Sequence, residues 1–162
     1  MPQEELPLEV AHPNRYEVVM KCQKWAITLL VNSQEKLEHR LFEIVIYLVH
    51  YYFLDKCLIS DLDATGNLGD QLTNKLNNKT FIHLSSREFL NLLNQEGQII
   101  ELEATLMEKE QELFKIIIRD GISVDILGSG KMIPRHILGD FISLDPELFF
   151  GQDELLIGAT TD

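Results

Sequence analysis

A run of thirteen residues at positions 42–54, FEIVIYLVHYYFL, constrains this chain more than any other segment. Eleven of the thirteen are apolar, and no Gly or Pro interrupts them. The apolar stretch is shorter than the ~20 residues that a membrane-spanning helix needs. It also contains Glu43 and His50, and both side chains are costly inside a bilayer. The sequence therefore predicts that protein, and not lipid, surrounds this run.

The same run continues a helical pattern that begins at Leu37, so we predict a helix here. Many of its residues are β-branched or aromatic and favour strands, but a strand of this length would exceed the usual five or six residues or so. A helix that is apolar on nearly all sides is expected to be buried on all sides. Either its own neighbours wrap it or a second chain packs against it, and we favour the second chain.

Apolar residues at three- and four-residue steps predict two more helices, one over 14–31 and a long one over 98–119. We expect the helix over 14–31 to form an antiparallel hairpin with the helix of the apolar run. Asn32 with Glu35 and Ser85 with Glu88 fit the capping box, which marks helix starts. Alternation over 122–126 predicts a strand, and 137–144 is a candidate for its partner. We therefore expect an α+β fold that is predominantly α-helical, with an N-terminal helical hairpin, further amphipathic helices and a small C-terminal β element.

The chain divides into three parts on composition. Residues 1–13 contain three prolines and are expected to form a flexible N-terminal arm. Residues 14–156 are expected to form a single helix-rich globular domain, and residues 157–162 a flexible tail. Within the domain, the segment 60–80 is rich in Asp, Asn, Gly, Ser and Thr, which predicts a loop with one short helix near 70–76.

The charge of the chain limits its partners. Fourteen basic and 26 acidic residues give a formal net charge of −12. Direct binding to nucleic acid or to an anionic membrane surface needs clustered Lys and Arg, so both are disfavoured. A basic partner protein is permitted. The two cysteines and the lack of an apolar leader after the acidic, Pro-rich first residues predict a cytoplasmic protein.

One short segment carries a candidate metal site. Asp61, Asp63 and Thr65 place oxygen atoms at alternate positions, and Gly66 follows them. This spacing resembles the calcium-binding loop of the EF-hand family. The resemblance covers only these few residues, and it ends at the twelfth position, where Leu72 replaces the glutamate of that family. It implies calcium as a cofactor with Asp61, Asp63 and Thr65 as ligands; otherwise we expect no cofactor.

The chain contains no recognisable catalytic motif. Its five histidines do not cluster at metal-binding spacing, and no serine lies in a nucleophile elbow. Glu43 and His50 are seven residues apart on one helical face and could form a buried ionic pair. We predict no catalytic residues and expect that the protein is not an enzyme.

These observations predict a non-catalytic protein-interaction module, either an acidic adaptor or a small chaperone-like protein, that associates with itself as a homodimer. The predicted interface consists of Tyr47, Tyr51, Phe53, Leu102, Leu106 and Leu113. A first alternative is an acidic decoy that inhibits a basic nucleic-acid-binding protein. A second alternative is a metal-binding protein or enzyme that uses the 61–70 loop or the helix of Glu43 and His50.

Overall fold

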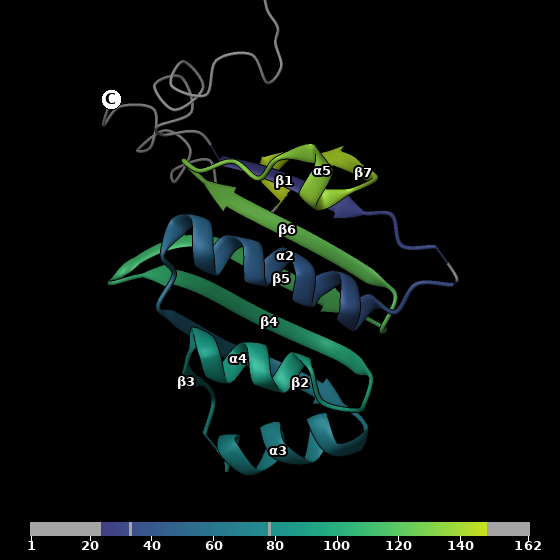
Figure 1. Ribbon diagram of the computed structural model, residues 1–162, viewed down its shortest axis with the longest axis vertical. Coiled ribbons are helices and arrows are strands. Elements are labelled where there is room, and N and C mark those ends of the chain that lie inside the picture. Colours follow the sequence, from purple (N-terminus) through teal and green to yellow (C-terminus); the bar gives the residue numbers. More distant parts are fainter. Residues whose placement is uncertain (1–23, 33, 78, 149–162) are drawn as a thin grey trace, which may run out of the picture.

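The computed structural model describes residues 24–32, 34–77 and 79–148, which form a seven-stranded antiparallel sheet with helices packed on one face (Figure 1). The strands are β1 (Lys24–Leu29), β2 (Lys56–Ala64), β3 (Ile82–Ser85), β4 (Ile99–Glu108), β5 (Gln111–Arg119), β6 (Ser123–Ser129) and β7 (Phe141–Leu144). The helices are α2 (Leu37–Tyr52), α3 (Gly66–Leu76), α4 (Ser86–Leu93) and α5 (Arg135–Leu138), followed by the 3-10 turn η1 (Pro146–Leu148). The strands lie in the order β3-β2-β4-β5-β6-β1-β7.

The core lies between the sheet and the helices α2 and α4. Strand alternation directs apolar cross-strand neighbours toward these helices. They form three rows across β4, β5 and β6, namely Leu102–Ile118–Val124, Ala104–Ile116–Ile126 and Leu106–Phe114–Gly128. From α2, the side chains of Leu41, Ile44, Val45 and Leu48 pack against the rows and are at most 1% exposed. Each fully buried Leu or Ile stabilises the fold by about 1.5–3 kcal/mol.

The predicted helix over 98–119 is wrong, because this segment forms the hairpin of β4 and β5. Lys109 and Glu110, which interrupt the helical pattern, form the turn, and Lys109 has a positive φ of 56°. In β4 the acidic residues Glu101 and Glu103 alternate with the apolar residues Leu102 and Ala104. This two-residue period is typical of a strand with one face buried. The expectation of a predominantly helical fold is therefore wrong as well.

The predicted N-terminal helical hairpin is also absent from the described residues. Residues 24–29, assigned to a helix over 14–31, form strand β1 between β6 and β7. Residues 14–23 lie outside the described part of the chain. β1 obtains its hydrogen-bonding partners from residues about 100 positions later, so no local pattern indicated them.

The apolar run does form a helix, and this prediction is confirmed by α2. The prediction that it is buried on all sides is wrong for the single chain. Ile46 is 36% exposed and Tyr51 56% exposed, and Phe53, at the C-cap, is 75% exposed. The sheet takes one side of α2 and α4 lies beside it, whereas the outer side faces away from both (Figure 1).

The segment 60–80 contains more regular structure than predicted. Residues 60–64 extend β2, and α3 covers the short helix expected near 70–76. The capping box of Ser85 and Glu88 is confirmed at the start of α4, where both reciprocal hydrogen bonds form. The strand predicted over 122–126 is confirmed as part of β6. The small C-terminal β element is therefore one side of a sheet that runs through the whole described region.

The described residues form one sheet with one core, within the expected 14–156 domain. The predicted arm at 1–13 and the tail at 157–162 lie outside the described residues. Among the helices that the structure describes, none is both long enough and apolar enough to span a bilayer.

Candidate functional site

The predicted calcium ligands are not arranged as a metal-binding loop. Asp61 and Asp63 lie in strand β2, opposite Glu103 and Glu101 of β4. Thr65 is the N-cap of α3, and its Oγ1 accepts a hydrogen bond of 3.1 Å from the backbone N–H of Gln98. An EF-hand loop curls its ligands around one ion, whereas an extended strand spreads them along its length. Among residues 24–32, 34–77 and 79–148, no three His, Cys, Asp or Glu side chains are grouped to hold a metal ion.

Carboxylates do gather on the sheet around one arginine. The guanidinium of Arg119 on β5 lies 3.6 Å from Asp61, 3.5 Å from Glu101 and 3.7 Å from Glu103. The four side chains come from three neighbouring strands. Because all of them are partly exposed, each pair contributes only about 0.2–1 kcal/mol to stability. The cluster is a surface network in which three acids share one arginine, so each acid has a partner within the chain but the group keeps a net negative charge.

Glu43 and His50 do not form the buried ionic pair considered from the sequence. Both are exposed on α2, and seven residues of helix separate them by about 10 Å along the axis. The Nδ1 atom of His50 lies 2.9 Å from the carbonyl oxygen of Ile46. This arrangement places the two residues at the surface as separate polar groups.

The six predicted interface residues separate into two groups. Tyr47 is half-buried, and Tyr51 and Phe53 are exposed at the C-terminal end of α2. Leu102, Leu106 and Leu113 lie in β4 and β5 and are at most 2% exposed, so they have no surface left for a partner. That part of the predicted interface is wrong, because it assumed that 98–119 was an amphipathic helix.

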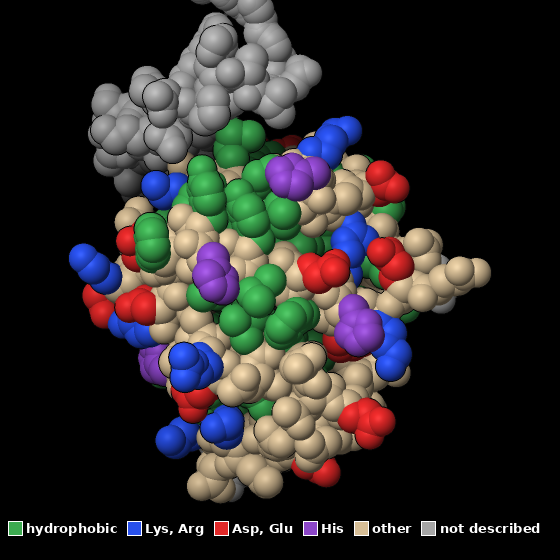
Figure 2. All heavy atoms as spheres, viewed as in Figure 1, with side chains coloured by type: hydrophobic (Ala, Val, Ile, Leu, Met, Phe, Trp, Pro, Cys, Tyr) green, Lys and Arg blue, Asp and Glu red, His purple; other side chains and the backbone are tan. Residues whose placement is uncertain are grey.

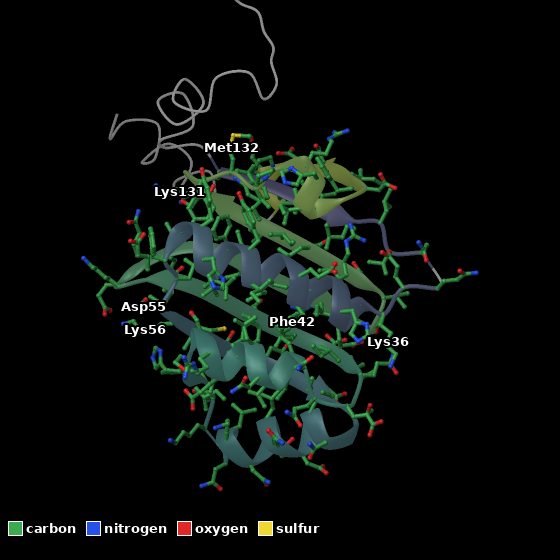
Figure 3. All side chains as sticks on the ribbon, viewed as in Figure 1. Lys36, Phe42, Asp55, Lys56, Lys131 and Met132 are labelled. Atoms are coloured by element: carbon green, nitrogen blue, oxygen red, sulfur yellow. The ribbon has the colours of Figure 1, made fainter. Side chains whose placement is uncertain are left out.

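The exposed group belongs to a larger apolar surface, which we call the α2 outer face and define as Phe42, Ile46, Tyr47, Val49, Tyr51 and Phe53. Ile46, Val49 and Phe53 follow Phe42 at helical spacing, and Phe42 lies between α2 and α4 (Figure 3). Hydrophobic side chains gather on this side of the molecule over α2 and between α2 and α4 (Figure 2). Sequence reasoning assigned Phe42, Ile46 and Val49 to an all-buried helix and missed their place on the outer side.

Aromatic contacts connect the α2 outer face to the core. Tyr47 stacks on Tyr51 with ring centroids 5.3 Å apart, and Tyr51 meets Tyr52 edge-on at 4.8 Å. Tyr52 in turn lies 5.4 Å from the buried Phe114. Burial raises the pKa of Tyr47, and the neighbouring Tyr51 raises it further. Tyr47 therefore carries no charge near neutral pH, and the rings of Tyr47 and Tyr51 are held by their neighbours.

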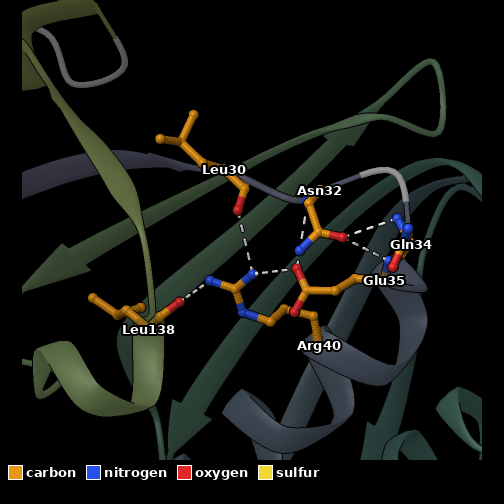
Figure 4. Close-up of polar contacts among 6 residues, drawn as sticks. All are labelled: Leu30, Asn32, Gln34, Glu35, Arg40 and Leu138. Carbon is orange, nitrogen blue, oxygen red and sulfur yellow. Dashed lines mark hydrogen bonds and ion pairs between the residues drawn. The ribbon is translucent and has the colours of Figure 1, made fainter.

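A polar hollow of about 440 Å³ lies at the N-terminal end of α2. Glu38, only 7% exposed, lines it and accepts a 2.8 Å hydrogen bond from the backbone N–H of Ile99. Asn32 and Glu35 also line it, and they hydrogen-bond to each other's backbone amides (Figure 4). Each of these side chains has a hydrogen-bonding partner within the chain, and Glu38 joins α2 to β4, so we assign the hollow a structural role.

Cys57 lies in β2 and is fully buried, and burial raises the pKa of its thiol. With Cys22 replaced by Ser, we expect Cys57 to react with a thiol reagent at pH 8 more than about tenfold more slowly in the folded than in the denatured protein. The free energy of unfolding should also fall above about pH 8.5, where the unfolded thiol releases its proton first. Absorbance of the released reagent measures the first effect. Equal rates in the two states would contradict the burial of Cys57.

Neither a protein-family model, nor a curated protein, nor a solved structure matches this chain.

Proposed function

We propose that this protein is a non-catalytic protein-interaction module that associates with a second copy of itself through the α2 outer face. The observation that carries the proposal is the exposure of large apolar side chains on one helix, with Ile46, Tyr51 and Phe53 between 36% and 75% exposed. Exposed apolar side chains that gather on one side of a folded chain are typical of sites where another protein binds.

The distribution of charge supports a second copy as the partner. With a net charge of −12, two copies repel each other over most of their surfaces. On the outer side of α2 the acidic residues are reduced to Glu43, which is accompanied by the exposed His39 and His50. Contact between two copies is least opposed at such a face, and the burial of its apolar side chains favours it.

The spacing of residues along α2 is compatible with a twofold contact. In a symmetric dimer the same patch is used by both copies. If two α2 helices cross antiparallel at Ile46, Phe42 of each copy lies opposite His50 of the other. His39 then lies opposite Phe53. Each exposed imidazole would meet an aromatic ring, and Glu43 would be the one acid at the contact.

Substitutions on the α2 outer face test the proposal. Ile46→Lys and Phe53→Ser are each expected to raise the dimer dissociation constant at least about tenfold, because they place a charge or a polar group in the contact. Sedimentation equilibrium measures this as a shift of the average mass toward the 18.7 kDa of one chain.

Ile122→Ser is the matched control, because Ile122 is 77% exposed in the turn between β5 and β6, where it lines the hollow at the N-terminal end of α2 and not the α2 outer face. It should leave the association unchanged. A wild-type chain that stays monomeric up to about 100 µM, or an equal effect of the control substitution, would refute self-association through this face.

The first alternative, an acidic decoy, receives less support. It requires carboxylates that are free to contact a basic protein. In the group of Asp61, Glu101 and Glu103, each carboxylate already contacts the one guanidinium of Arg119, although the group as a whole stays negative.

A further inference from the structure

The strand β3 leaves one side of its backbone unpaired. β3 is an edge of the sheet and pairs only with β2. Within the described part of the chain, the backbone of residues 80–84 makes no hydrogen bond outside this pairing. Native proteins commonly protect an edge with Pro, with charged residues or with a bulge. The sequence IHLS of β3 contains neither Pro nor an acidic or basic residue other than His83, and its pairing with β2 is continuous.

A groove of about 660 Å³ follows this edge and is lined by residues 79–84 together with Lys75 and Glu88. Phe81 is 48% exposed, and its ring meets the His83 ring edge-on with centroids 5.7 Å apart. The two side chains are two residues apart, so both lie on the same face of the strand. They offer an apolar and aromatic surface to alternate side chains of a strand placed alongside β3.

The groove is locally basic in an acidic protein. Lys75 and Lys79 both line it, and Lys79 forms no ion pair with any carboxylate of the described residues. The only carboxylate of the lining is Glu88, which accepts a hydrogen bond from the Ser85 backbone N–H and lies 3.6 Å from Lys75. The Ser85 N–H, followed by Lys75, lowers the pKa of Glu88, so this carboxylate stays ionised and engaged. The charge left for a ligand is therefore positive.

We propose that the β3 edge binds an extended acidic segment of a partner protein, which adds to the sheet as an eighth strand. Backbone hydrogen bonds to residues 80–84 would hold the segment, and its carboxylates would lie near Lys75 and Lys79. This site is separate from the α2 outer face, and it does not depend on self-association of the chain.

A peptide series tests the site directly. The probe is a fluorescein-labelled octapeptide of alternating Val and Glu with capped ends, and its binding to the full chain is followed by fluorescence anisotropy. A peptide with Lys in place of Glu, and one with two central residues replaced by Pro, are expected to bind at least about tenfold more weakly, because they lose charge complementarity and backbone pairing respectively. Amide hydrogen exchange should slow at residues 80–84 when the acidic peptide is bound.

Charge-reversal variants of the protein show which lysine contributes to binding of the acidic peptide. Lys79→Glu should weaken binding at least about fivefold, whereas Lys36→Glu, at the N-terminal end of α2 on the other side of the molecule (Figure 3), should leave it within about twofold. Circular dichroism confirms that both variants fold. The proposal is overturned if the acidic peptide does not bind, if the Lys or Pro peptide binds equally well, if the two variants behave alike, or if exchange slows elsewhere.

Discussion

Replacing Arg40 with Ala is expected to lower the free energy of unfolding by about 2–4 kcal/mol. The side chain is only 10% exposed. Its guanidinium donates hydrogen bonds to the carbonyl oxygens of Leu30 and Leu138 and lies 3.2 Å from Oε1 of Glu35 (Figure 4). Leu30 directly follows β1, Leu138 ends α5, and Glu35 precedes α2. Removal of Arg40 therefore leaves partly buried acceptors unpaired and releases three segments from one another.

Chemical denaturation measures the loss for Arg40→Ala, and Lys56→Ala is the control. Lys56 also forms an ion pair, at 2.6 Å with Glu110, but Glu110 is 88% exposed. Solvent screens such an exposed pair, so the control should cost little. Equal losses for the two variants would show that Arg40 does not connect these segments. Gly139→Ala is a second test of the same contact. A Cβ at this position would overlap the Arg40 guanidinium, so this variant should also lower the free energy of unfolding.

Replacing Gly128 with Val is expected to destabilise the fold by about 1–3 kcal/mol, although a β-branched residue normally favours a strand. Gly128 on β6 lies opposite Trp25 on β1 and opposite Phe114 on β5. A Cβ on Gly128 would overlap the Trp25 indole. The indole and the Phe114 ring meet edge-on above the glycine, with centroids 6.3 Å apart. The added side chain would force Trp25 out of this position.

Trp25 reports this displacement, because it is the single tryptophan of the chain. Its Nε1–H donates a 2.6 Å hydrogen bond to the carbonyl oxygen of Lys131, which the displaced ring would lose. We expect the emission maximum of Gly128→Val to shift to longer wavelength as the indole becomes wetter. Ser123→Thr, at the partly exposed start of β6, adds a methyl group without contacting Trp25 and should change neither stability nor emission. A stabilised Gly128→Val variant with unchanged emission would contradict the packing described.

Features that depend on neighbours within about four residues could be predicted from the sequence. The start of α4 follows from Ser85 and Glu88, since each satisfies the other's free amide. The helix over the apolar run follows from its continuity with Leu37. In the same way, alternation over 122–126 indicated a strand that the structure contains.

The segment 98–119 shows why the rest was missed. Ile99, Leu102, Leu106, Leu113, Ile116 and Ile117 occur at three- and four-residue steps, yet the residues that face the core are spaced by two. Leu102 and Leu106 fit the helical spacing, and Leu102, Ala104 and Leu106 fit the strand spacing. Only the pairing of this segment with β2 and β5 shows that the strand spacing applies. Aliphatic side chains occur in both kinds of structure, so the sheet period was read as a helix period.

Only part of the candidate site could be predicted from the sequence, because the rest depends on how the elements pack. Tyr51 and Phe53 were expected at an interface and are exposed, which leaves their role in binding as a proposal. Ile46 and Phe42 were missed because periodicity does not show which side of an all-apolar helix meets the sheet. The groove at β3 was missed because an edge strand exists only once the order of strands is known.

The sequence by itself determined that most of the run 42–54 coils into a helix, where α4 begins, and that the chain is strongly acidic. These properties depend on residue type and on contacts between near neighbours. Only the tertiary structure decided that β1 pairs with β6 and β7, that α2 keeps one apolar side outward, and that β3 ends the sheet. Strand pairing joins residues such as Trp25 and Gly128 that are about 100 positions apart, and no local pattern in a single chain specifies such a partner.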